Sequence, residues 1–136
     1  MQEPMNIQSI IDTHDPPLPI KRILIVDDLK VNFLLIKALL QKSGFETVWA
    51  ESGYSAIELI ESGCFFDAVI MDYNMPEIDG LQATLVIKKI QPNMVVISHS
   101  TFTDTSSFDR SNAPFDDYLP KPIKSQNLKE ILQKYC

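Results

Sequence analysis

The sequence has few cysteines and no long apolar run, and both absences limit what the protein can be. Cys64 and Cys136 are the only cysteines among 136 residues, too few for the disulfide framework of a small secreted domain. No segment approaches the ~20 consecutive apolar residues that a membrane span needs. The first residues also lack the basic and then apolar pattern of a signal peptide. We therefore expect a cytoplasmic protein that does not span a membrane.

Basic residues are scarce as well. The chain has 12 lysines and arginines against 18 aspartates and glutamates, which gives a net charge of −6. This balance argues against a nucleic-acid partner bound through a basic face. Apolar residues make up 45% and charged residues 22% of the chain, a balance typical of globular proteins. The length fits one domain with a hydrophobic core.

Prolines are concentrated ahead of this domain. Residues 1–20 hold four of the nine prolines and show little helical periodicity. We interpret them as a flexible extension, in which "PPLP" forms an extended linker. Residues 21–136 then make up the single domain.

From residue 22 onward, short apolar runs alternate with helical patterns. The predicted strands are 22–28, 45–50, 67–72, 94–100 and 116–120. The predicted helices are 29–44, 52–63, 80–90 and 125–136. Strands that alternate with helices indicate an α/β fold, a doubly wound parallel sheet with helices on both faces.

The first of these helices has an apolar stripe that we expect to face the core. The residues spaced for one face are Val31, Leu34, Leu35, Ala38 and Leu39, and Gly44 marks the end of the helix.

The segment 101–115 fits the alternation poorly. A fourth helix is required there, but the segment is rich in serine and threonine, which compete for backbone hydrogen bonds and favour turns. We expect a short or irregular fourth helix, within about residues 104–111.

Charged and hydroxyl side chains follow the predicted strands. Asp27 and Asp28 follow the first strand, Asp72 ends the third, the run 98–101 ends the fourth and Lys121 follows the fifth. Because the carboxyl ends of parallel strands meet at one edge, where such folds bind ligands, we expect these groups to lie together.

This set of groups suits phosphoryl transfer. Clustered carboxylates repel one another unless a cation neutralises them, and oxygen ligands without histidine or cysteine favour Mg²⁺. A carboxylate can act as the nucleophile and form an acyl phosphate, while an ammonium and a hydroxyl bind phosphoryl oxygens. Taken singly, Asp28 is more often a helix cap, and Lys121 more often a solvated loop residue.

Three motifs in these positions resemble the receiver domain of response regulators in two-component phosphorelay signalling. They are the acidic pair in "ILIVDD", the loop in "VIMDYNMPEIDG" and the turn in "YLPKP". Asn32 makes the first helix most similar to receivers of hybrid histidine kinases. The resemblance covers residues 21–136 and implies a flavodoxin-like five-stranded sheet of order 2-1-3-4-5.

The resemblance also implies roles for individual residues. Asp72 would be the phosphorylated aspartate. Asp27 and Asp28 would hold Mg²⁺ together with Asp72, and Asn74 would offer its backbone carbonyl to the ion. Lys121 would contact the phosphoryl group, and its bond to the following proline would be cis.

Two serines are candidates for the switch hydroxyl. A gap-free match from Gly80 favours Ser100, and a shift of two residues would select Ser98 instead. Tyr118 matches the aromatic switch position on the fifth strand; otherwise it is an ordinary half-buried tyrosine. We interpret His99 as a packed strand residue rather than a functional one.

The function implied is a Mg²⁺-dependent phosphorylation switch rather than an enzyme with its own substrate. A histidine kinase or histidine phosphotransfer protein would donate the phosphoryl group, and a downstream protein would read the change. Nothing after the last helix resembles an output domain, so we expect a single-domain form. Dimerisation on phosphorylation stays open.

Two alternatives remain. A degenerate receiver would bind its partner without phosphorylation. A phosphatase of the haloacid-dehalogenase type would also use a strand-end aspartate, but Asn74 stands where such enzymes have a second aspartate.

Overall fold

The structure is a computed structural model that describes residues 21–101 and 113–136. The extension predicted for residues 1–20 and the irregular helix predicted within 104–111 lie outside the described residues. Across the described ranges, no helix combines the length and apolar character that a membrane crossing requires.

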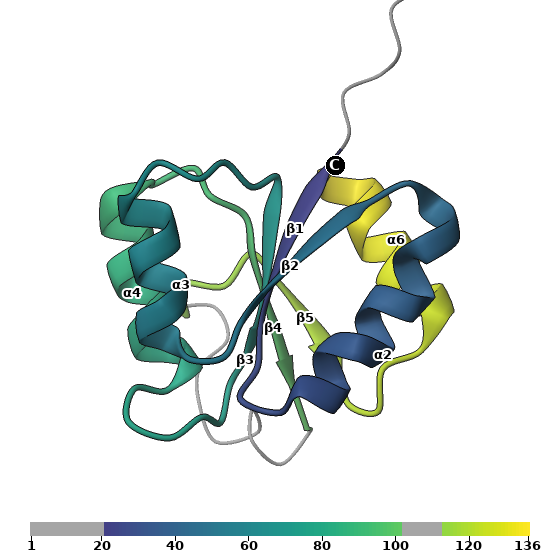
Figure 1. Cartoon of the computed structure of the whole chain (residues 1–136), viewed down its shortest axis with the longest axis horizontal. Coiled ribbons are helices and arrows are strands. Elements are labelled where there is room, and N and C mark those ends of the chain that lie inside the picture. Colours follow the sequence, from purple (N-terminus) through teal and green to yellow (C-terminus); the bar gives the residue numbers. More distant parts are fainter. Residues whose placement is uncertain (1–20, 102–112) are drawn as a thin grey trace, which may run out of the picture.

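A five-stranded sheet forms the centre of the domain (Figure 1). Its strands are β1 (Arg22–Val26), β2 (Glu46–Ala50), β3 (Ala68–Asp72), β4 (Val96–Ser100) and β5 (Asp117–Pro120). All neighbouring strands pair in parallel, in the order β2-β1-β3-β4-β5. The predicted fold class and strand order are therefore confirmed.

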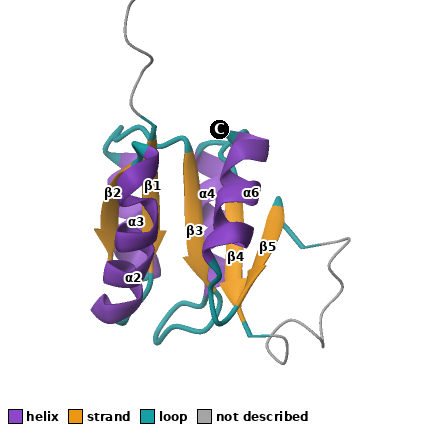
Figure 2. Cartoon of the chain, turned by 90° about the vertical axis from the view of Figure 1, so that its right-hand side faces the viewer, coloured by secondary structure: helices purple, strands orange, loops and turns teal. Residues whose placement is uncertain are grey.

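Helices cover both faces of this sheet. They are α2 (Lys30–Leu40), α3 (Gly53–Glu61), α4 (Gly80–Ile90) and α6 (Ser125–Tyr135). Figures 1 and 2 show α3 and α4 on one face, and α2 and α6 on the other. Each face has its own apolar core, and every residue of β3 and β4 is buried. Burial on both faces explains why β3 is apolar up to its final aspartate.

Local signals in the sequence set several helix boundaries. The Ser52 hydroxyl accepts the backbone N–H of Ser55 at 3.0 Å at the start of α3. The Asp79 carboxylate accepts that of Gln82 at 2.8 Å at the start of α4. These caps satisfy backbone donors that the first helical turn leaves unpaired. A 3-10 turn, Gln41–Ser43, extends α2, and Gly44 ends it with φ of 80°, the left-handed conformation that ends many helices.

The predicted inward face of α2 is wrong. Val31 is 67% exposed and Leu35 48% exposed, whereas the buried residues of this helix are Phe33, Ile36 and Leu40. The helix carries two apolar stripes, so its periodicity alone does not select one of them. Packing against the sheet selects the stripe that contains Phe33, whose ring stacks on the Trp49 ring of β2 at 5.8 Å.

Candidate functional site

The polar groups predicted to meet do lie at one edge of the sheet. Asp27 follows β1, Asp72 ends β3, Ser100 ends β4 and Lys121 follows β5. In Figure 2 this is the lower edge, toward which the strand arrows point. The parallel topology is the reason, because it directs every strand terminus to the same side.

Three carboxylates form a tight cluster at this edge. Asp27, Asp28 and Asp72 each offer one oxygen, and these oxygens lie within 4.8 Å of one another. Asp27 and Asp72 are only 1% and 3% exposed, while Asp28 is exposed. Like charges this close and this poorly hydrated are costly without a compensating cation.

Lys121 supplies part of the compensation. Its ammonium donates to the carboxylate of Asp72, with Nζ–Oδ1 at 2.8 Å. The turn that places it contains a cis Lys121–Pro122 bond, as the resemblance implied. The Lys121 backbone N–H also donates to the Ser100 carbonyl at 2.9 Å, which ties the turn to the end of β4.

Burial raises the pKa of Asp72 from 3.8 to about 6. Loss of hydration is the largest cause, the hydrogen bond from Lys121 opposes it, and the negative charge of Asp27 adds to it. Near neutral pH, the ionised form of the Asp72 carboxylate therefore carries a cost in free energy. A positively charged ligand would lower that cost.

Asp27 has one carboxylate oxygen available for such a ligand. Its Oδ1 accepts from the Leu29 N–H at 2.9 Å and from the Asn32 side-chain amide at 3.2 Å. Its Oδ2 is buried, and no donor reaches it among the residues that the structure describes. A buried acceptor of this kind calls for a partner, and an oxygen-only donor set suits Mg²⁺. The residues present therefore fit the ion that the resemblance implies.

The loop after β3 is held tightly against the site. Asn74 lies in this loop, exposed, two residues beyond Asp72. The Gly80 N–H donates to the Tyr73 carbonyl at 2.8 Å, and a Cβ at Gly80 would come within 2.3 Å of the Asp72 carbonyl oxygen. Only glycine permits this approach. Gly80 was not among the predicted site residues.

The register separates the two candidate hydroxyls. Ser100 pairs with Pro120, next to Lys121, at the end of the sheet. Ser98 pairs with Tyr118 two residues deeper, and its buried hydroxyl has no hydrogen-bond partner within the described part of the chain. Both side chains are buried. Ser100 is therefore the hydroxyl placed nearer to Lys121 along the strand.

The fifth strand carries the aromatic residue singled out in the sequence. Tyr118 is half-buried and packs edge-to-face on Phe115, with ring centroids 5.9 Å apart. His99 occupies the pair opposite Asp72, and burial lowers its pKa to about 4. His99 is thus a neutral, packed strand residue at neutral pH, in agreement with the structural interpretation.

Trp49 lies in the predicted strand 45–50 and also contacts the site. Its indole N–H donates to the Asp27 backbone carbonyl at 2.8 Å. No local sequence pattern predicts this contact, because it depends on the pairing of β2 with β1.

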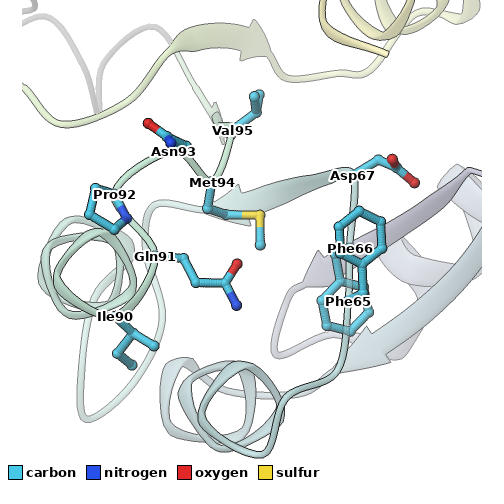
Figure 3. Close-up of a pocket in the computed structure, with 9 residues that line it drawn as sticks. All are labelled: Phe65, Phe66, Asp67, Ile90, Gln91, Pro92, Asn93, Met94 and Val95. Carbon is cyan, nitrogen blue, oxygen red and sulfur yellow. The ribbon is translucent and has the colours of Figure 1, made fainter.

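A second concavity lies at the opposite edge of the sheet. This cleft of about 480 Å³ is lined by residues 65–67 and 90–95 (Figure 3). Its ionisable side chain, Asp67, already accepts the Arg22 N–H at 2.7 Å. The cleft therefore offers one carboxylate that is already hydrogen-bonded, in contrast to the three clustered carboxylates at the other edge.

A doubly wound parallel sheet with three carboxylates and a lysine at its carboxyl edge defines the architecture of a receiver protein. Residues 23–133 match the response regulator receiver domain. The chain belongs to this family, as the motifs of the sequence indicated.

Known relatives support the same assignment. Sensor protein GacS of Pseudomonas syringae pv. syringae is 35% identical over 130 residues, covering 88% of this chain and 14% of that protein. The chain spans 7–14% of the length of the first curated relatives that it matches, which include hybrid histidine kinases of Dictyostelium discoideum.

Two solved structures are similar along most of the chain. The receiver domain of a sensor histidine kinase from Pseudomonas aeruginosa PAO1, with a magnesium ion in its active-site cleft, has 31% identity and a TM-score of 0.76, covering 86% of this chain and 98% of that one. Response regulator TrrA from Thermotoga maritima, in complex with Mg²⁺-BeF, has 35% identity and a TM-score of 0.78, covering 86% and 100%.

Proposed function

We propose that this receiver domain is a phosphorylation switch in which Asp72 accepts a phosphoryl group from a phosphohistidine. The observation that carries the proposal is the buried Asp72 carboxylate, joined to Lys121 at 2.8 Å within a cluster of three carboxylates. Simple helix caps would not require two buried acids and a lysine from three distant segments to converge.

The chemistry divides among the residues at this edge. A carboxylate oxygen of Asp72 forms a bond to phosphorus while the P–N bond of the phosphohistidine breaks, and the imidazole nitrogen keeps the electron pair. Lys121 is placed to bind a phosphoryl oxygen once the transfer has occurred. Mg²⁺, held by Asp27, Asp28, Asp72 and the Asn74 carbonyl, would offset the charge of the transferred group.

The same step would supply the signal. A phosphoryl group at Asp72 adds negative charge and strong acceptor oxygens, which would draw in the Ser100 hydroxyl. Movement there would allow Tyr118 to turn inward and would alter the surface near β5 and α6. Output would then occur through protein contacts, and the domain would catalyse only its own phosphorylation and dephosphorylation.

The exposed side of α2 is the surface on which we expect the phosphohistidine partner to dock. Leu29, Val31, Leu34 and Leu35 are 47–67% exposed there, next to Asp28 at the carboxyl edge. Lys30 and Lys37 extend from the same helix and favour a partner with acidic residues around its histidine. We place this exchange in the cytoplasm, where Cys64 and Cys136, both free thiols, would stay reduced.

The proposal is tested with a small phosphodonor and Mg²⁺, followed by intact mass. Wild type should gain the mass of one phosphoryl group, and Asp72→Asn should gain none because the nucleophile is lost. Asp67→Asn, a carboxyl at the opposite edge, serves as the control and should keep the adduct.

Three results would contradict the assignment. An equal adduct in Asp72→Asn would place the phosphoryl group elsewhere. An absent adduct in wild type would favour a binding module that works without phosphorylation, and steady release of phosphate from a phosphomonoester would favour a phosphatase.

A further inference from the structure

Asp27 is fixed by more contacts than a metal ligand at a strand end requires. Its side chain, its carbonyl and its N–H are all hydrogen-bonded, and the partners come from α2, from Leu29 just before it, and from β2. Two of these partners, Asn32 and Trp49, use side-chain atoms. Neither touches Asp72 through any contact that the structure records.

On the side-chain end, both donors reach the same oxygen. The Leu29 N–H and the Asn32 amide converge on Asp27 Oδ1 at 2.9 and 3.2 Å. Oδ2 is left as a buried acceptor with no donor from the described residues. Two donors on one oxygen prevent the carboxylate from rotating, so that Oδ2 keeps one direction.

Trp49 holds the backbone of Asp27, as Asn32 holds its side chain. Its indole N–H donates to the Asp27 carbonyl at 2.8 Å, and Asp27 N–H donates to the Ala50 carbonyl at 3.1 Å. The indole ring is itself braced, because it stacks on Phe33 at 5.8 Å with an interplanar angle of 18° and lies 5.8 Å from the Lys30 ammonium. The peptide that carries Asp27 therefore cannot tilt without disturbing this stack.

We propose that Asn32 and Trp49 are positioning residues that aim Asp27 Oδ2 into the carboxylate cluster and so set its affinity for Mg²⁺. The inference rests on the proposed function, since it assumes that the cluster binds the ion. Hydrogen bonds that orient a ligand are worth about 10–100-fold in metal affinity in comparable sites. Asn32 and Trp49 do this work from outside the cluster, and neither contacts the ion.

A purely structural role makes a different prediction. The Leu29 N–H to Oδ1 contact is a local turn that Asp27 would form in any case, and Asn32 could simply close the first turn of α2. Its loss would then lower stability by the same amount with and without Mg²⁺. A positioning role instead lowers the extra stability that Mg²⁺ confers, because that increment depends on the binding affinity.

The test is a Mg²⁺ titration of the whole chain followed by amide chemical shifts in two-dimensional NMR. Asn32→Ala and Trp49→Phe are compared with wild type, and Trp49→Phe keeps an aromatic ring on Phe33 while removing the donor. Each should shift the Mg²⁺ midpoint about tenfold upward. Leu85→Ala, an exposed apolar truncation on α4, is the matched control and should leave the midpoint unchanged.

Thermal unfolding with and without saturating Mg²⁺ adds a second readout. At a fixed Mg²⁺ concentration, the rise in melting temperature that Mg²⁺ causes should be smaller in both variants than in wild type. Midpoints and Mg²⁺ increments equal to wild type in both variants would overturn the positioning role and leave the proposed function intact. A wild type whose amide shifts do not respond to Mg²⁺ would overturn the proposed function and this inference together.

Discussion

Asp72 and His99 lie opposite each other on β3 and β4, and burial acts on both of them in favour of the neutral form. The pKa of Asp72 rises to about 6 and that of His99 falls to about 4. Loss of hydration is the largest cause in each case. In the metal-free domain below neutral pH, the contribution of Asp72 to stability therefore falls as pH rises, whereas that of His99 increases.

For Asp72 the sign follows from the proton balance. The folded state binds its proton more tightly than the unfolded state, whose pKa is near 3.8. Its contribution to stability is therefore largest below about pH 4 and is lost as pH rises through about 6. We expect the unfolding free energy of wild type minus that of Asp72→Asn to fall by up to about 3 kcal/mol over this range.

Urea unfolding between pH 4 and 7.5, in the presence of a chelator, measures this difference. His99 is present in both proteins, so its own titration cancels. A difference that does not change with pH would contradict the raised pKa of Asp72. Addition of Mg²⁺ at pH 7.5 should return part of the lost stability to wild type and less to the variant, which lacks one of the three carboxylates.

At the scale of single residues, the sequence located the acids well and their supports poorly. Asp27, Asp28 and Asp72 are recognisable because each follows an apolar run. Trp49 and Gly80 acquire their roles from partners that lie far away along the chain or across a loop. Such contacts leave no periodic pattern.

The secondary-structure elements were predicted closely except in orientation. The span of α4 is 80–90 in both the prediction and the structure, and the predicted strands differ from the observed ones by one or two residues at their ends. The exception is the face of α2 that packs on the sheet. Its two apolar stripes offer similar burial, and only the sheet decides between them.

Truncations on the two stripes of α2 test the corrected orientation. Ile36→Ala removes a fully buried side chain and should lower the unfolding free energy by about 2–5 kcal/mol. Leu35→Ala, on the exposed stripe, should change it by less than about 0.5 kcal/mol. Both keep the helix-forming propensity of the position or improve it.

Chemical denaturation of the two variants separates the orientations. Equal losses, or a larger loss for Leu35→Ala, would return the helix to the face that its periodicity first suggested. Leu35→Ala should also slow phosphoryl transfer from the protein partner while leaving that from a small phosphodonor intact.

On the scale of the whole molecule, the two ends of the sheet serve different purposes. The carboxyl edge gathers uncompensated charge, whereas the amino edge is a structural junction. There Arg22 donates its N–H to Asp67, pairs with Glu46 at 2.8 Å and lies over the Phe66 ring at 5.2 Å. β3 separates the two edges by roughly 17 Å at its rise of about 3.3 Å per residue.

The two edges should respond independently to substitution. Asp67→Ala leaves the Arg22 N–H without its 2.7 Å partner and should cost about 1–3 kcal/mol of stability. Its Mg²⁺ midpoint should stay at the wild-type value, because the separation exceeds the Debye length of about 8 Å. Asp28→Ala should do the reverse, weakening Mg²⁺ binding without lowering metal-free stability.

Measurements of both unfolding and Mg²⁺ binding on these two variants test whether the two edges are independent. A shifted midpoint in Asp67→Ala would mean that the sheet transmits strain between its edges. The cleft at the amino edge (Figure 3) would then have to be counted as part of the functional unit.

The sequence by itself determined the alternation of elements, the parallel sheet and the identity of the groups at its carboxyl edge, including the motifs "ILIVDD", "VIMDYNMPEIDG" and "YLPKP". These features are local, because apolar runs, caps and turn residues act within a few positions. The tertiary structure alone decided which stripe of α2 is buried, how far burial shifts the pKa of Asp72, and which residues hold Asp27 in place. Those properties arise from contacts between strands and helices distant in sequence, and packing settles them only when the whole domain has formed.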